Sequence, residues 1–455
     1  MNTSFFNEML SSIAEQGRSL LERRRDRSAS GRAVGDICEA LLSGRGEASG
    51  VALAGDVLAS YRALSEEART EFFEELFTRF GTDREEIERL AREIAQNPGD
   101  EKLVRRMHMA SEPKRQELIR RLNLAPGGTS GLVAMRAELL QRLKDKPELD
   151  EVDRDFEHLF SSWFNRGFLV MRRIDWSTPA SILSKIIRYE AVHEIRDWED
   201  LRRRIDLADR RLYAFFHPAL VDDPLIFVEV ALTREIPAAI PPILAEERAE
   251  ISAEEATTAT FYSISNCQKG LRGISFGNFL IKQVVEELRR ELPNLKTFVT
   301  LSPVPGFRTW LAKDMESEES VARRALSQDQ VEAIGNDAFE HDEETRNTIA
   351  EPLRALCAHY LVREKRGNSD RPLDPVARFH LGNGARLERV NWFGDPSANG
   401  VRQSFGVMVN YLYDLGDIEK NHEAFAAHGT VATSSSVSRL LKAVPDKKKT
   451  VVPAA

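Results

Sequence analysis

The chain has 455 residues, a formal net charge of −8 and a pI of about 5.8, with 42% hydrophobic and 30% charged residues. This composition is typical of a globular protein and excludes a disordered or fibrous chain. The small acidic excess argues against nucleic acid as a partner, and no stretch approaches the ~18 consecutive apolar residues of a membrane helix, so we expect neither interaction.

Residues 1–163 are predicted to form a helical bundle. In Ser65–Gly81 the apolar residues recur at helical spacing, with Ser65 as a candidate N-cap. Thr82–Glu85 has the pattern of a capping box before the next helix. Later helices are expected to begin at Ser111, Thr129 and Asp150. The region shows no convincing strand and no cluster of reactive side chains.

Residues 164–455 are predicted to form a mixed α/β catalytic domain. Short β-rich runs are expected at Phe168–Ile174, Arg211–Phe216 and Leu225–Leu232, with helices at Ser181–Tyr189 and Asp197–Ile205. The stretch Thr258–Ser302 has the order strand, glycine-rich turn, amphipathic helix, strand, which is a βαβ unit. The predicted fold class is therefore α+β, an all-helical N-terminal domain followed by a mixed one.

A glycine-bearing turn, Arg272–Asn278, lies between the first strand and the helix of this unit. Free N–H groups at a helix start attract phosphate, although a purely structural turn is an equally weighted alternative. The spacing matches neither a Walker A loop nor a dinucleotide fingerprint. It resembles the acyl-CoA-binding turn of GNAT-type N-acetyltransferases, with Ser275 in place of the middle glycine. In that fold the pantetheine arm runs between two strands that part, here Phe261–Ser265 and Thr297–Leu301.

Three longer segments, at 217–232, 261–311 and 374–415, resemble the malonyl-CoA decarboxylase family. The strings LSPVPGF and ARFHLGNGA are the most specific parts of the match. The resemblance implies a helical oligomerisation domain over residues 1–163 and a GNAT-like catalytic domain over residues 164–455. It further implies a homotetramer that converts malonyl-CoA to acetyl-CoA and CO2 without a cofactor or a metal ion.

The resemblance also implies the residues of the site. A catalytic pair falls on Ser302 and His380. Besides this pair, the expected malonyl-CoA contacts are Arg272, Gly273, Ile274, Ser275, Phe276, Gly277, Asn278 and Ile281. Tyr413 and Asn391 are not implied by the resemblance but come from segments near His380 in the sequence, and they are expected to support the pair and to help orient the substrate.

These residue types suit the implied chemistry. Loss of CO2 leaves an enolate that needs a proton, and histidine, with an unperturbed pKa of ~6.5, carries and releases protons near neutrality. Ser302 would hold the imidazole, bind the departing carboxylate or relay a proton. Attack of Ser302 on the thioester is disfavoured, because no GxSxG elbow surrounds it. Outside the family context, a turn-capping serine and a structural histidine remain the ordinary readings.

The three cysteines, Cys38, Cys267 and Cys357, are too far apart for a CxxC pair and indicate a reducing compartment. No secretory or transit pattern precedes them, so a cytoplasmic location is predicted. Cys267, beside the turn, is expected to be a buried structural thiol, and His217 is placed outside the site.

Two other functions remain open at this stage. A GNAT-type acyltransferase that modifies an amine would use the same turn. A helical interaction scaffold with a degenerate enzyme attached would bind no coenzyme A. The segments that contain Ser302 and His380 favour the decarboxylase.

Overall fold

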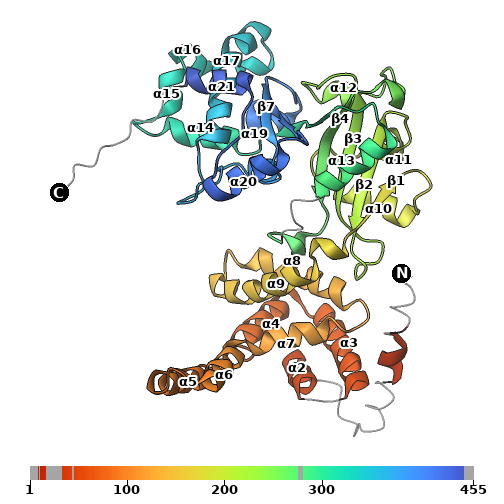
Figure 1. Ribbon diagram of the computed structural model, residues 1–455, viewed down its shortest axis with the longest axis vertical. Coiled ribbons are helices and arrows are strands. Elements are labelled where there is room, and N and C mark those ends of the chain that lie inside the picture. The colour runs from red at the N-terminus through yellow and green to blue at the C-terminus, as the bar shows by residue number, and fades with distance from the viewer. Residues whose placement is uncertain (1–8, 10, 17–32, 44–45, 275–279, 445–455) are drawn as a thin grey trace, which may run out of the picture. The chain divides into compact units, whose positions relative to one another are not determined.

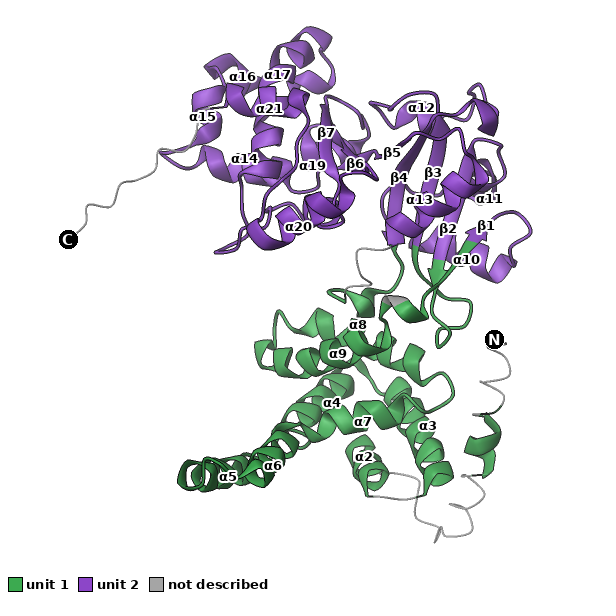
Figure 2. Ribbon diagram, viewed as in Figure 1, with its two compact units in different colours: residues 1–172, 215–226, 266–277 green, residues 173–214, 227–265, 278–455 purple. Residues whose placement is uncertain are grey.

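The computed structural model of the chain describes residues 9, 11–16, 33–43, 46–274 and 280–444 (Figure 1). The chain divides into two compact units (Figure 2). Unit 1 comprises residues 1–172, 215–226 and 266–277, and unit 2 comprises residues 173–214, 227–265 and 278–455. The domain boundary at 163/164 stays a prediction.

Unit 1 consists mainly of consecutive helices (Figure 1). They are α2 (Val34–Leu42), α3 (Glu47–Ala63), α4 (Glu66–Thr78), α5 (Arg84–Gln96), α6 (Glu101–Ser111), α7 (Lys114–Leu122), α8 (Gly128–Arg142), the 3-10 turn η1 (Pro147–Leu149) and α9 (Asp150–Trp163). The described residues between 33 and 163 form no strand, as predicted. Ser65 caps α4 by accepting a hydrogen bond from the Ala68 N–H, also as predicted.

Two predicted helix starts are wrong. Asp83, not Thr82, caps α5, because the Asp83 carboxylate accepts a hydrogen bond from the Glu86 N–H in place of the predicted capping box. Ser111 ends α6, where its hydroxyl donates to the His108 carbonyl at 2.8 Å.

A buried arginine joins the helices of unit 1 to the segment that follows β4. Arg136 of α8 is 2% exposed and pairs with Asp153 of α9 at 2.7 Å. Its Nη1 also donates to the carbonyls of Gly270 and Arg272, each at 2.9 Å. Because a buried charge is costly unless every donor is satisfied, these partners fix the backbone at 270–272 against α8.

Unit 2 holds most of an eight-stranded mixed sheet, in the order β1-β2-β3-β4-β5-β8-β6, with β7 paired to β8. The strands are β1 (Val170–Ile174), β2 (Arg210–Phe216), β3 (Pro224–Thr233), β4 (Thr258–Asn266), β5 (Thr297–Thr300), β6 (Ser302–Pro303), β7 (Arg386–Asn391) and β8 (Met408–Leu412). The parallel pair β4 and β5 is connected through α13 (Leu280–Glu291), which confirms the predicted βαβ unit.

The pairing of β4 with its neighbour stops part-way along the strand. β4 and β5 pair from Thr258↔Thr297 to Phe261↔Thr300, and the Leu301 N–H donates to the Phe261 carbonyl at 2.9 Å. Beyond that point the chain stays with β8, since Ser302 pairs with Val409 in the register that β5 began. The far half of β4 therefore parts from β5 and β6, as the acyl-CoA interpretation predicts.

Helices surround the sheet. Those between the early strands are α10 (Ala180–Tyr189), α11 (Trp198–Ile205) and α12 (Pro241–Leu244). After β6 come α14 (Phe307–Met315), α15 (Val321–Ala325), α16 (Gln328–Gly335), α17 (Glu343–Val362), α18 (Pro375–Gly382), α19 (Ala398–Ser404), α20 (Ile418–His428) and α21 (Ser435–Ala443). The sequence predictions include no element for α12 or for the helices from α14 to α21.

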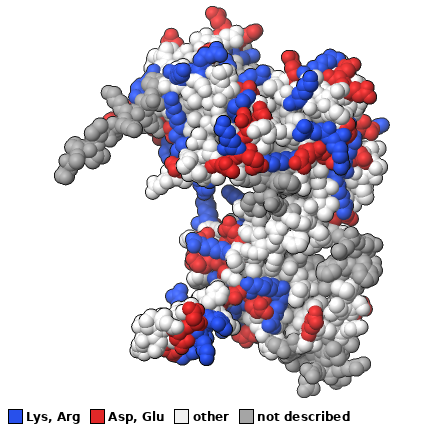
Figure 3. Space-filling model, in the orientation of Figure 1, with Lys and Arg blue, Asp and Glu red and all other residues white. Residues whose placement is uncertain are grey.

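The observed fold is a helical N-terminal region followed by a mixed α/β region, which confirms the predicted α+β class. Lys and Arg are interspersed with Asp and Glu on the face drawn in Figure 3. Within the described ranges, no helix has both the length and the apolar content needed to cross a membrane.

Gly270, in the short turn η4 (Lys269–Leu271), gives a test of the tight contact with α8. A Cβ at Gly270 would lie 1.8 Å from the Val133 carbonyl oxygen. Gly270→Ala is therefore expected to lower the free energy of unfolding by ~1–3 kcal/mol, as overpacked positions do. Gly55→Ala in α3, where a Cβ meets nothing within 4 Å, is the control and is expected to stabilise slightly. Equal denaturation midpoints for the two variants would contradict the contact.

Candidate active site

Ser302 lies where the chain leaves β4 and continues along β8. Thr300, two residues earlier, points to the same side, because side chains alternate along an extended strand. The Ser302 hydroxyl donates to Thr300 Oγ1 at 2.9 Å, and Ser302 is 5% exposed. Thr300 Oγ1 in turn accepts the backbone N–H of Tyr411 at 3.1 Å. A threonine on β5 thus anchors the serine to β8.

His380 is positioned by α18. Asp374 caps this helix by accepting a hydrogen bond from the Ala377 N–H at 2.8 Å. Pro375 fills the first helical position, where no N–H is needed and the proline φ already suits a helix. These start signals fix the helix register and therefore the place of His380, which is 3% exposed.

The structure brings Ser302 and His380 together. Ser302 Oγ lies 3.2 Å from His380 Nε2, and His380 Nδ1 lies 2.8 Å from the Tyr413 hydroxyl oxygen. Tyr413 is buried and follows directly on β8. The predicted pair and one predicted supporting residue therefore form a single hydrogen-bonded chain with Thr300.

Hydrogen-bond counting assigns the protons in this chain. The single proton of the Ser302 hydroxyl is donated to Thr300, so Ser302 Oγ accepts at its contact with His380 and Nε2 carries a proton. Burial lowers the pKa of His380 to about 3, so the ring is neutral. Nδ1 then has a free lone pair and accepts the Tyr413 hydroxyl.

The pKa of His380 corrects one expectation from the sequence. A histidine with an ordinary pKa would gain and lose a proton near neutral pH, whereas burial keeps the His380 ring uncharged at that pH. The side chains in contact with it are also uncharged, because burial raises the pKa of Tyr413 and of Tyr411. The Tyr411 ring stacks on the imidazole at 4.7 Å between centroids.

Asn391 is linked to the reacting pair through other residues. Its Nδ2 donates to Asn410 Oδ1 at 2.8 Å, and Asn410 Nδ2 donates to the Thr300 carbonyl at 2.8 Å. Asn391 therefore reaches the site through Asn410 and Thr300.

The predicted acyl-CoA turn is described only at its start. Arg272 is exposed, Gly273 has a φ of +86°, and Ile274 is buried. A positive φ is strained for a residue with a Cβ, which explains why glycine occupies position 273. Ser275, Phe276, Gly277 and Asn278 lie outside the described residues. Ile281 is buried in the first turn of α13.

The far half of β4 is organised by a carboxylate. Glu190, just after α10, accepts hydrogen bonds from the hydroxyls of Ser263 at 2.8 Å and of Ser265 at 3.0 Å. It also accepts the backbone N–H groups of Val192 and His193. Ser263 and Ser265 belong to the part of the strand that no longer pairs with β5, so a side chain orders this segment.

Cys267 and His217, which the sequence analysis placed outside the site, have the surroundings of residues with a structural role. Cys267 is a buried thiol, as predicted. The His217 ring is tilted against that of Phe164, with 4.9 Å between the ring centroids, and its Nδ1 accepts the Ala219 N–H at 3.2 Å. The described residues contain no group of three or more His, Cys, Asp or Glu side chains arranged to hold a metal ion.

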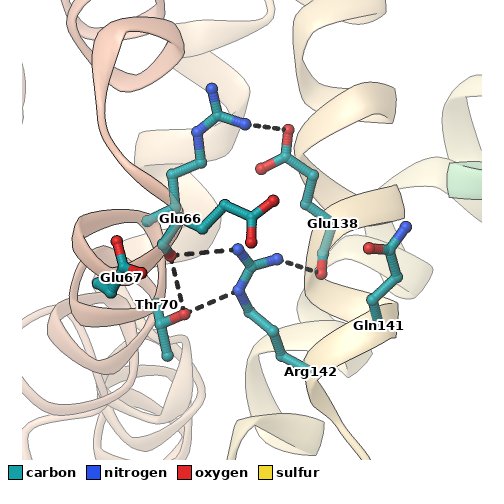
Figure 4. A pocket seen from close by; sticks show the side chains of 7 residues that line it. Glu66, Glu67, Thr70, Glu138, Gln141 and Arg142 are labelled. Atoms are coloured by element: carbon teal, nitrogen blue, oxygen red, sulfur yellow. Dashed lines mark hydrogen bonds and ion pairs between the residues drawn. The ribbon is translucent and has the colours of Figure 1, made fainter.

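An open cleft of about 500 Å³ lies in unit 1, between α4 and α8 (Figure 4). It is lined by Glu66, Glu67, Arg69, Thr70, Glu138, Gln141 and Arg142. Arg69 pairs with Glu138 at 2.8 Å, and Arg142 is bonded to Thr70 and to two backbone carbonyls. Because its cations are already paired and it contains none of the predicted residues, this cleft is not the candidate site.

Thr300 and Tyr411 are site residues that the sequence interpretation missed. Each has a signal in hindsight, since Thr300 shares a strand face with Ser302 and Tyr411 shares one with Tyr413. This signal is weak, because the alternation of side chains along a strand does not reveal which helix packs on that face and therefore which residues meet there.

Comparison with known proteins identifies relatives over nearly the whole chain. Residues 80–164 match the malonyl-CoA decarboxylase N-terminal domain family, and residues 167–451 match the malonyl-CoA decarboxylase C-terminal domain family. The mitochondrial malonyl-CoA decarboxylase of the goose Anser anser anser is 37% identical over 350 residues, which cover 71% of this chain and 69% of that protein.

Solved structures give the same result. The crystal structure of malonyl-CoA decarboxylase from Rhodopseudomonas palustris superposes with a TM-score of 0.86 at 55% identity, covering 89% of this chain and 98% of that one. The enzyme of the same name from Agrobacterium vitis gives a TM-score of 0.82 at 52% identity, covering 90% and 99%.

Thr300 provides a test of the hydrogen-bond chain. Thr300→Val removes the acceptor of the Tyr411 N–H and of the Ser302 hydroxyl with almost no change in shape. A buried donor left unpaired costs ~1–3 kcal/mol, so we expect the free energy of unfolding to fall by that amount. Thr300→Ser keeps the hydroxyl and should be closer to the parent protein in denaturant titrations. If serine and valine were equally destabilising, the hydroxyl would have no such role.

Proposed function

Because the chain belongs to the malonyl-CoA decarboxylase family, we propose that it is a carboxy-lyase that converts malonyl-CoA to acetyl-CoA and CO2 at Ser302 and His380. One observation supports this assignment most strongly. Ser302 Oγ and His380 Nε2, on segments far apart in the chain, lie 3.2 Å from each other, buried beside the point where β4 parts from β5.

Coenzyme A is proposed to bind through the turn Arg272–Asn278 and Ile281, as the family resemblance implies. Backbone N–H groups that precede a helix are suited to the pyrophosphate. The pantetheine arm would follow the unpaired part of β4. Its amides would find backbone groups there that have no partner on β5.

The uncharged surroundings of His380 favour loss of CO2. A malonyl carboxylate beside these side chains gives up its water without gaining a cation, which raises its free energy. The CO2 that leaves is neutral, so it loses little hydration free energy in the same dry surroundings. The site therefore lowers the barrier by destabilising the localised charge of the carboxylate relative to the transition state, in which that charge spreads onto the thioester.

The proton comes from a neutral donor in this proposal. The bond between the carboxylate carbon and the α-carbon breaks, CO2 leaves, and the electron pair stays on the thioester enolate. The His380 Nε2–H bond then breaks as the new C–H bond of acetyl-CoA forms. An enolate carbon is basic enough to take a proton from an uncharged imidazole. The Tyr413 hydroxyl stabilises the ring through Nδ1, and a proton from water restores it.

Ser302 aligns Nε2 rather than attacking the thioester. Its own proton is directed at Thr300, and its oxygen accepts from His380, so it has no base to deprotonate it. We propose no cofactor, since the thioester itself delocalises the electron pair.

The alternative function, a GNAT-type acyltransferase, is less well supported. Transfer to an amine needs a general base with a pKa near the working pH. Burial lowers the pKa of His380 to about 3, which makes it a weak base. The same neutrality does not hinder protonation of an enolate.

We further propose a homotetramer in which residues 1–163 contribute to assembly. In support, α6 buries none of its residues and exposes Val104 and Met109 to 47% and 71%, so these apolar side chains are available for contact with another subunit. A monomer mass in sedimentation experiments would contradict this. A cytoplasmic location is also proposed, supported by three buried thiols, and cell fractionation tests it.

The experiment that tests the function supplies carboxyl-labelled malonyl-CoA without any amine. We expect labelled CO2 to be released and acetyl-CoA to form in equal amounts. His380→Gln is expected to lower kcat by ~10²–10⁴-fold with little change in KM, because the donated proton is needed only in the transition state.

The matched control is His108→Gln, which changes an exposed histidine of α6 and should leave turnover unchanged. Label release that depends on an added amine would favour the acyltransferase. A large rise in KM with an intact kcat in His380→Gln would assign that residue to binding alone.

A further inference from the structure

Tyr411, on β8, is a buried tyrosine to which the proposed reaction assigns no chemistry. It is 0% exposed, and its ring lies almost parallel to the His380 ring, at 4.7 Å and an interplanar angle of 24°. Its hydroxyl has no hydrogen-bond partner among the described residues. A buried hydroxyl without a partner destabilises a fold, so the ring of Tyr411, rather than its hydroxyl, accounts for an aromatic residue at this position.

Hydrogen bonds alone do not fix the plane of His380. Ser302 holds Nε2 and Tyr413 holds Nδ1, at opposite edges of the ring. Both contacts lie at the edge of the ring, so a tilt of the ring plane bends these hydrogen bonds before it breaks them. Such a tilt changes the direction in which Nε2–H points. The stacked face of Tyr411 opposes the tilt.

The backbone N–H of Tyr411 helps to hold Ser302, the other member of the catalytic pair. The Tyr411 N–H donates to Thr300 Oγ1, which accepts the Ser302 hydroxyl. Thr300 also has its carbonyl held by Asn410, the neighbour of Tyr411. One short segment of β8 therefore sets the orientation of both the serine and the imidazole.

We propose that Tyr411 is a positioning residue whose ring face holds the His380 imidazole in the orientation that protonates the substrate carbon. This inference rests on the proposed function. A proton donor that is misaligned by a fraction of an ångström loses much of its rate advantage, while binding of the rest of the substrate is unaffected. The defect should therefore appear in kcat rather than in KM.

The test compares three variants with malonyl-CoA as substrate. Tyr411→Leu is expected to lower kcat by about tenfold or more, with KM within about twofold of the parent value. Tyr411→Phe keeps the flat face without the hydroxyl and is expected to rescue most of that loss.

Tyr213→Leu is the matched control. Tyr213 is also a buried tyrosine, 1% exposed, but it lies on β2, which β3, β4 and β5 separate from β8 in the sheet, and its hydroxyl donates to Glu291 at 3.3 Å. It reports the general cost of losing a buried ring and should leave kcat unchanged. Loss of kcat to the same degree in Tyr213→Leu, or failure of Tyr411→Phe to rescue, would overturn the proposal.

A spectroscopic readout separates this proposal from the function on which it rests. The ¹⁵N signals of His380 should keep the Nε2–H form in Tyr411→Phe and shift toward a mixture of tautomers in Tyr411→Leu. If the leucine variant does not fold, Tyr411→Met fills similar volume without a flat face and replaces it. Unchanged signals in the leucine or methionine variant would contradict the positioning role, even if the parent protein released no CO2.

Discussion

Removal of water from the His380 imidazole is the constraint on which the site depends. Burial lowers its pKa to about 3, and its contacts with Ser302, Tyr413 and Tyr411 are all uncharged. A histidine held in this way cannot act as an imidazolium near neutral pH. The same dry surroundings that suppress its charge would also disfavour a malonyl carboxylate, so in the proposed mechanism the choice of donor and the ease of CO2 loss have one physical cause.

The sheet creates these surroundings. β4 leaves β5 after Phe261, whereas β5 and β6 keep a continuous register along β8. The parting leaves the far half of β4 without a partner on β5, and the proposed path of the pantetheine arm follows this half. Where strand pairing ends, hydrogen bonds from side chains take its place. Asn410 donates to the Thr300 carbonyl, and Glu190 accepts the hydroxyls of Ser263 and Ser265 along the far half of β4.

The sequence was sufficient for the fold class and for the pairing of Ser302 with His380. Both residues lie in unusually specific strings, and the βαβ unit has a clear change of hydrophobic period. Thr300 and Tyr411 were missed, because strand registers and the helix that covers them are tertiary properties. The pKa of His380 was wrongly expected to be ordinary for the same reason, since desolvation depends on packing.

Local errors have local causes. Thr82 and Asp83 both have side chains suitable for an N-cap, and only backbone geometry chooses between them. α17 contains Pro352 in its interior, which in a sequence reads as a helix break. The coenzyme A-binding roles of Arg272–Asn278 and Ile281 all stay predictions, and Ser275 to Asn278 also lie outside the described residues.

The protonation state of His380 tests the central claim most directly. Histidine-selective ¹⁵N labelling, with His380→Gln to assign the signal, allows its titration to be followed in the intact protein. We expect a neutral ring with the proton on Nε2 throughout pH 5–8. A midpoint near 6.5, or a proton on Nδ1, would contradict the neutral-donor mechanism.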